Sequence, residues 1–364
     1  MKKILFPVSL LMGFACGTWP GHAAVGTLTG PFTHRNLQLF LIHGRTQLEQ
    51  RPYATLSEAL AKGYVIIKET GSVQELSIVN VSKEVTVFVQ AGDIVKGGRQ
   101  DRTVRDDLIL PPDSGAVPLP AFCVEHGRWT RRGEENAAAF SANTKALSSK
   151  QEKLAARYGQ DQSGVWAGVA EQQLKLNDNV SRLAGRSVDT RSSVSGSSLQ
   201  LTLENKDLDL VEKEYLEKLD SILDGKTDVI GFAYAINGEI NSAEVYNNKK
   251  LFRALWPKLL DAAVTEAVTE CDADRQFPAM KPEEVKAFFE RAVSGSVAER
   301  RVWQSTRVKT YTSPTTVLFE TLDLDADSVW IHKSFINKGQ EKVVVPLDRN
   351  SRDDGQQLQQ RRVR

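Results

Sequence analysis

The sequence lacks the features that would assign it at once to a special class of protein. Only three cysteines occur in 364 residues, which is too few for a disulfide-stapled domain or a cysteine-rich zinc site. Neither sign of charge dominates, because 47 lysines and arginines face 46 acids. Bulk positive charge for binding nucleic acid or a membrane surface is therefore missing. Beyond the N-terminal segment, no apolar run approaches the ~20 residues needed to span a bilayer.

That N-terminal segment has the pattern of a secretory signal. Two lysines precede an apolar run over residues 4–19, and residues 21–23 (Gly-His-Ala) supply the small side chains that a signal peptidase requires. We expect cleavage after Ala23 and export of the mature chain to the periplasm or the medium. Cys16 raises a lipoprotein alternative, in which the acylated thiol would anchor the protein to a membrane. The leucine usual three positions before such a cysteine is absent.

The composition along the chain predicts four parts. A signal peptide (1–23) precedes a main α+β domain (24–270), a β-rich extension (271–348) and a basic tail (349–364). The tail has hardly any apolar residue and is predicted to be disordered. The fold class expected is α+β, in which a β-rich N-terminal half packs with a helical middle segment and a small C-terminal β unit.

The N-terminal half is rich in β-branched and aromatic residues at strand length. One short helix over 55–62 interrupts the strands, and the proline-rich stretch 111–120 predicts a loop. Strands are predicted at residues 36–42, 65–67, 76–81, 85–89, 108–110 and 121–124.

The middle of the chain changes to residues that favour helices. Helices are predicted over 134–158, 163–183 and 204–224, and the serine-rich stretch 187–198 between them predicts a flexible loop. Asn237-Gly238 is a strong hairpin signal between two strands.

The helix expected over 247–270 is the most apolar of the chain. Its apolar pairs recur every four residues, so the stripe drifts around the helix and implies contact with more than one neighbour. Pro257 lies inside it and predicts a kink or a fresh start. A short helix over 282–292 and strands over 302–310, 316–322 and 329–336 complete the pattern.

One stretch, residues 92–107, combines glycines with cations in a way that suits an anion. Glycines permit positive φ, so successive N–H groups can converge into a nest, and arginine forks match phosphate or carboxylate. A second motif, residues 123–129, follows a strand and carries ionisable side chains. The ligand-binding residues predicted from the two motifs are Lys96, Gly97, Gly98, Arg99, Gln100, Arg102, Glu125 and Arg128.

Other interpretations of the same residues stay open. Gly97-Gly98 suits an ordinary hairpin turn, with the arginines paired to Asp101, Asp106 and Asp107 in a structural network. Glu125, Asp101 and Cys123 are candidates for catalysis, although a buried cysteine is usually core. Whether Cys123 pairs with Cys271 is also open. No metal ion or cofactor is expected from the histidine and cysteine spacing.

These motifs also carry a resemblance. Residues 92–103, 123–129 and Gln162-Ser163-Gly164-Val165-Trp166 resemble the domain family named for its association with ADP-ribosylglycohydrolases and rhodanese-phosphatase proteins, over about residues 28–268. The resemblance implies handling or sensing of an ADP-ribose-like ligand, and it implies no established catalytic residues.

Three functions therefore compete. The first is a module that binds or senses an anionic small molecule, with Lys96, Arg99 and Arg102 on phosphate and Trp129 available for stacking. The second is a hydrolase acting on such a ligand through Glu125, Asp101 or Cys123. The third is an envelope scaffold without a ligand.

Overall fold

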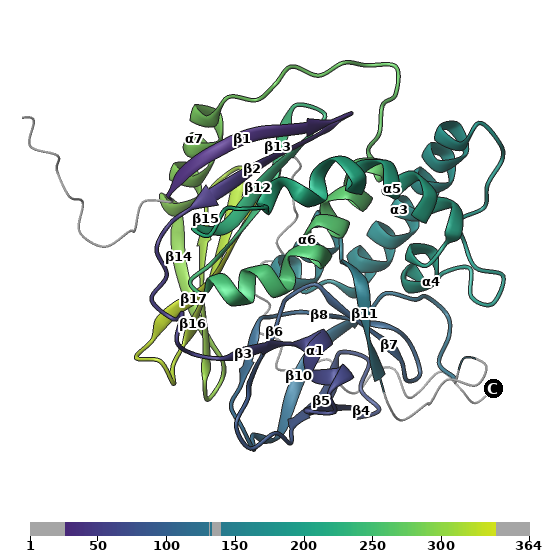
Figure 1. Ribbon diagram of the computed structural model, residues 1–364. Helices are drawn as coiled ribbons and strands as arrows, with labels where there is room; N and C mark the ends of the chain where they lie inside the picture. The colour runs from purple at the N-terminus through teal and green to yellow at the C-terminus, as the bar shows by residue number, and fades with distance from the viewer. Residues whose placement is uncertain (1–25, 131, 133–139, 340–364) are drawn as a thin grey trace, which may run out of the picture.

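The computed structural model describes residues 26–130, 132 and 140–339. It is an α+β fold rich in strands, with the helices in the middle of the chain, as predicted (Figure 1). The predicted signal segment 1–23 and the tail 349–364 lie outside the described residues. Within the described residues, no helix has both the length and the apolar character needed to cross a membrane.

An eight-stranded antiparallel sheet gathers strands from both ends of the chain, in the order β1-β2-β12-β13-β17-β16-β15-β14. Two C-terminal strands form as predicted, at residues 316–323 and 329–337, whereas the predicted strand 302–310 is divided by a turn into the end of one strand and the start of the next. All four C-terminal strands belong to the same sheet as the N-terminal hairpin. The strands of this sheet are β1 (Thr27–His34), β2 (Leu37–His43), β12 (Val229–Ile236), β13 (Glu239–Tyr246), β14 (Ser296–Trp303), β15 (Thr306–Thr312), β16 (Thr316–Asp323) and β17 (Val329–Asn337).

The rest of the N-terminal half forms two smaller sheets, with the orders β11-β7-β8-β10-β5-β4 and β3-β6-β9. The first contains β4 (Val65–Glu69), β5 (Glu75–Asn80), β7 (Asp93–Gly97), β8 (Arg102–Val104), β10 (Gly115–Cys123) and β11 (Phe140–Leu147). The second contains β3 (Tyr53–Thr55), β6 (Thr86–Val89) and β9 (Leu108–Leu110). Thr55 and Glu58 form a capping box that starts α1 (Leu56–Ala61).

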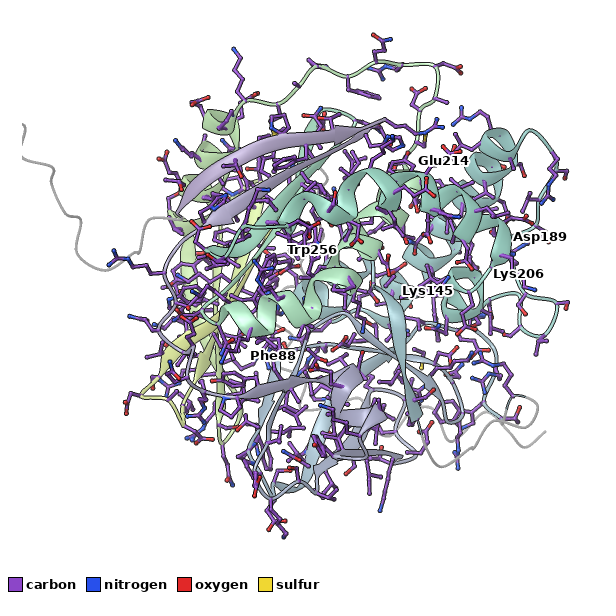
Figure 2. The ribbon with its side chains drawn as sticks, viewed as in Figure 1. Phe88, Lys145, Asp189, Lys206, Glu214 and Trp256 are labelled. Atoms are coloured by element: carbon purple, nitrogen blue, oxygen red, sulfur yellow. The ribbon has the colours of Figure 1, made fainter. Side chains whose placement is uncertain are left out.

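Helix α6 (Lys249–Thr269) crosses the centre of the molecule between the large sheet and the smaller ones (Figure 1). It packs against β11, β12, α3 (Gln162–Ala184) and α5 (Lys206–Leu219), which confirms the central helix that the drifting stripe predicts. Pro257 lies inside the helix without restarting it. Trp256 of α6 and Phe88 of β6 share one buried core in the interior, whereas Asp189 and Lys206 lie at the rim (Figure 2).

Helix α7 (Pro282–Val293) covers the other face of the large sheet, where Phe288 and Phe289 pack against Phe40 and Phe335 in a separate core. Both faces of the sheet are thus covered. This explains why β12 and β2 are almost entirely apolar instead of alternating with polar residues. The remaining helical segments are α2 (Lys150–Lys153), η1 (Leu154–Gly159), α4 (Leu199–Leu203) and η2 (Asp220–Leu223).

Two further predictions of local structure are wrong. Part of the predicted helix 134–158 is strand β11, which pairs with β7, because sheet pairing overrides the weak helix propensity of alanine and lysine there. Part of the predicted loop 111–120 belongs to β10. Its residues 115–120 pair with β5 alone, while residues 121–123 pair with β8, so Pro118 and Pro120 can turn their missing N–H groups to an unpaired side.

Candidate functional site

The two predicted motifs do come together. Gly97 ends β7 and Gly98 follows it, while Arg102 begins β8. Strand β8 pairs with the end of β10, so that Arg102 lies opposite Cys123. The Gln100 side-chain amide donates to the Glu125 carbonyl oxygen at 2.8 Å. Residues 97–102 and 123–129 therefore form one surface at this end of the six-stranded sheet, which we call the Trp129 surface.

The glycine turn makes an anion nest, but the chain's own carboxylates occupy it. Gly97 and Gly98 have φ of +121° and +55°. Gly97 N–H donates to Asp101 Oδ1 at 3.0 Å and Arg99 N–H to Glu69 Oε1 at 2.8 Å. A Cβ on Gly98 would lie 2.6 Å from the same Glu69 oxygen, so glycine is needed for this close approach. The nest thus recognises Glu69 and Asp101 in this structure.

Two buried acids form the centre of the ionic network beneath this turn. Asp101 accepts from Arg132 at 2.8 and 3.2 Å and from Ser198 Oγ at 2.9 Å. Glu125 accepts from Arg128 Nε at 2.7 Å and from Ser195 Oγ at 2.5 Å. Both carboxylates are fully buried, so each depends on these partners for compensation of its charge.

The protonation states of the catalytic candidates follow from these surroundings. Burial opposes ionisation of Glu125, but hydrogen bonds from Arg128 and Ser195 outweigh it and lower its pKa. Burial raises the pKa of the Cys123 thiol to about 11, so Cys123 stays a neutral, inert thiol. Cys123 and Cys271 are both free and buried.

The predicted cations divide into two groups. Lys96 pairs with Glu204 at 2.7 Å, and Arg105 pairs with Asp106 at 2.7 Å. Arg99 and Arg102 instead place their guanidinium groups 5.5 and 5.4 Å from the Trp129 ring centroid. Arg99 and Arg102 therefore place positive charge against the exposed aromatic ring of Trp129.

Arg102 is the most unusual of these side chains. It is fully buried, and its Nη1 donates to the Gln100 carbonyl oxygen at 2.9 Å. Its Nε and Nη2 have no hydrogen-bond partner among the described residues, and the Glu69 carboxylate lies 3.7 Å from Nη2. Unsatisfied donors on a buried charge are costly in free energy.

The aspartates of the same stretch serve the fold instead. Asp93 pairs with Lys258 of α6, and Asp106 accepts from Arg300 of β14 at 2.7 Å. Asp107 receives Arg157 of η1 at 3.1 Å and the His332 ring at 2.9 Å. These ion pairs tie the smaller sheets to α6 and the large sheet. Of the pairs that the second interpretation predicts, Arg105–Asp106 is present, whereas Asp101 and Asp107 pair with arginines from outside the stretch.

His332 of β17 lies in the middle of this network. Its Nδ1 is 2.9 Å from Asp107 and its Nε2 is 2.9 Å from Glu244, and all three side chains are buried. Only a doubly protonated imidazole donates from both ring nitrogens. Burial alone would lower the pKa of His332, but the two carboxylates outweigh it and raise the value to about 8.

Sequence reasoning missed several members of the site. Glu69 lies on β4, Arg132 follows the second motif, and Ser195 and Ser198 belong to the stretch predicted to be a flexible loop. No spacing connects these residues to the glycine turn, because the sheet order and the loop path bring them there.

Comparison with known proteins shows the family of this chain. The chain matches no curated protein and no solved structure. One family model matches residues 27–336, from the start of β1 into β17, and so includes the C-terminal strands beyond the range of the sequence resemblance. All three motif segments lie within it. The chain therefore belongs to the family of the ARG and Rhodanese-Phosphatase-superfamily-associated Protein domain.

Proposed function

We propose that this domain binds a small anionic molecule that carries a flat ring, of the phosphate or ADP-ribose-like class, at the Trp129 surface. The observation that supports the proposal is the pair of guanidinium groups, from Arg99 and Arg102, on the ring of Trp129. Trp129 is 37% exposed and Arg99 is exposed. Across residues 26–130, 132 and 140–339, no carboxylate lies within 4 Å of the Arg99 guanidinium.

The chemistry of this surface suits such a ligand. A phosphate would receive charge-assisted hydrogen bonds from the Arg99 fork, and a planar ring would stack on the indole of Trp129. Arg128, whose side chain is 11% exposed, is held beside them by Glu125. In this proposal Lys96, Gly97, Gly98 and Gln100 shape the turn through their contacts with protein atoms. Arg99 and Arg128 contact the ligand, and the buried Arg102 adds positive charge beside Trp129.

The same contacts favour binding over hydrolysis. Glu125 and Asp101 are ion-paired carboxylates inside a closed network, so neither is placed as a general acid. The Cys123 thiol would have to ionise against a raised pKa before it could attack a substrate. A stable site of paired charges is what a binding module requires.

Thermal unfolding in the presence of ADP-ribose, AMP, phosphate and citrate tests the proposal. We expect ADP-ribose and AMP to raise the Tm, because a ligand at 100 times its Kd adds about 2.7 kcal/mol of stability. Arg99→Ala should weaken binding by about tenfold or more, since a hydrogen bond to a charged group contributes roughly 1.5–3 kcal/mol. Trp129→Ala should reduce the preference of the site for AMP over phosphate.

The control is Arg45→Ala, which removes an exposed arginine far along the sequence from both motifs and should leave binding unchanged. If none of the four compounds shifts the Tm, the scaffold interpretation replaces the binding proposal. Release of product from ADP-ribose that is lost in Glu125→Gln and kept in Cys123→Ala would instead favour a hydrolase.

We also propose that the mature protein is exported, on the strength of the lysines, the apolar run and the small residues at positions 21–23. N-terminal sequencing of the protein from a periplasmic fraction should give a chain that begins at Ala24. A chain that stays in the cytoplasm with its N-terminus intact would contradict the export proposal, and lipid on Cys16 would support the lipoprotein alternative instead.

A further inference from the structure

A cavity of about 570 Å³ lies away from the Trp129 surface. Its walls are the start of α2, one face of α3, the turn between β12 and β13, and the end of α6. It shares no residue with the site proposed above. Its volume falls in the range of small-molecule pockets in proteins.

The buried part of the cavity wall is polar. Gln172, Asn241, Glu266 and Thr269 line the cavity, and each is 5–6% exposed. Glu266 accepts the Lys150 N–H at 2.6 Å and the Asn241 side-chain amide at 2.9 Å. These groups are fixed in place by the fold, as the floor of a binding site requires.

The side chain of Gln172, which lines the cavity, has unsatisfied hydrogen-bonding groups. Its side-chain amide makes no hydrogen bond to any residue that the structure describes, and its Oε1 is buried. A buried amide without partners costs free energy. Gln172 lines the cavity and its Oε1 is fully buried, so its Nε2 is the group to which a ligand would offer a hydrogen-bond acceptor.

The charges around the cavity indicate that this ligand is neutral. Four cations, Lys150, Lys175, Arg275 and Lys338, line the cavity together with the four acids Glu171, Glu239, Glu266 and Glu270. Lys175 bonds two of these acids, at 2.9 and 2.8 Å. A ligand with a strong charge of either sign would therefore meet as much repulsion as attraction.

Apolar groups lie among the polar ones. Phe277 lines the cavity beside the hairpin turn, where its ring also carries the Arg275 guanidinium at 5.1 Å. Leu154 and Ile240 are buried on the cavity wall. This combination matches a sugar ring. Amides and carboxyls form hydrogen bonds with hydroxyl groups, and aromatic and aliphatic side chains pack against the C–H faces of the ring.

We propose that this cavity binds a neutral saccharide, a mono- or disaccharide, whose hydroxyl groups reach the Gln172 amide and the Glu266 carboxyl. Burial raises the pKa of Glu266 above its ordinary value. The oxygens of this carboxyl accept hydrogen bonds from hydroxyl groups.

Calorimetric titration of the full mature chain with glucose, galactose, N-acetylglucosamine and cellobiose tests the proposal, with glycine and phosphate as comparison ligands. We expect at least one sugar to bind. Gln172→Leu should weaken that binding by about tenfold or more, because the lost partners leave sugar hydroxyls unpaired. The same variant without sugar should keep or raise its Tm, since it removes an unsatisfied polar group.

The Trp129→Ala variant is the matched control. Its sugar binding should equal that of the wild type, while its binding of AMP changes, so the two proposed sites are tested separately. The proposal is overturned if no sugar binds, if Gln172→Leu binds the sugar as well as the wild type does, or if the cavity takes glycine or phosphate in preference to sugars.

Discussion

Replacing His332 with glutamine should lower the free energy of unfolding by about 3–5 kcal/mol, because it breaks a buried ionic cluster by removing one partner. Asp107 and Glu244 each lie 2.9 Å from a ring nitrogen of His332 and are buried. Urea unfolding of wild type and variant at pH 6 measures the loss. His126→Gln, at an exposed histidine, is the control, and a loss no larger than the control's would contradict the prediction.

The same cluster predicts a pH dependence. The folded protein raises the pKa of His332 from 6.5 to about 8, so the stabilisation is complete below pH 6.5 and is lost as the pH rises through about 8. The shift is equivalent to about 2 kcal/mol. Glu152 and Glu212, whose pKa values burial raises to about 7 and about 8, also destabilise the fold as pH rises. The difference between wild type and His332→Gln isolates the histidine.

Asp101→Asn should be nearly as damaging, with a loss of about 3 kcal/mol or more, because the charge opposite the buried Arg132 disappears. Asp101 also fixes the glycine turn through Gly97 N–H. The matched control is Asp189→Asn, since Asp189 forms a similar pair with Arg191 but lies at the rim of the molecule (Figure 2), with its side chain 59% exposed. We expect little loss of stability from Asp189→Asn, because solvent screens an exposed ion pair.

Chemical denaturation of the two aspartate variants decides between the interpretations of this carboxylate. A stability loss in Asp101→Asn that far exceeds the control's would identify Asp101 as part of the structural network. Asp101→Asn with unchanged stability and lost turnover of ADP-ribose would contradict that role and favour catalysis.

Local patterns in the sequence predicted the elements whose causes are local. The stripe along residues 247–270 predicted α6, and Asn237-Gly238 predicted the turn of the β12–β13 hairpin, where both residues adopt positive φ. Strand β11 was missed because its cause is not local. It forms because it pairs with β7, and nothing in the composition of residues 134–158 indicates that pairing.

The candidate site shows the same division. Glycines and arginines in residues 92–107 predicted an anion nest, and the nest is present, but Glu69 and Asp101 occupy it. Glu69 comes from a strand on the far edge of the sheet order, beyond β8, β10 and β5. Residue types predicted the chemistry of the turn, whereas the choice between an internal and an external carboxylate depended on three-dimensional neighbours.

The order of the eight-stranded sheet has a consequence for folding. Strand β2 forms a hairpin with β1, and its other neighbour is β12, where Leu41 lies opposite Phe232. Strand β13, which follows β12, pairs in turn with β17, a strand that is synthesised much later. Pairings so distant along the chain are slow to form. The first hairpin to leave the ribosome therefore keeps one edge of β2 unpaired until residues 229–236 of β12 have emerged, and chaperones can bind that edge during this interval.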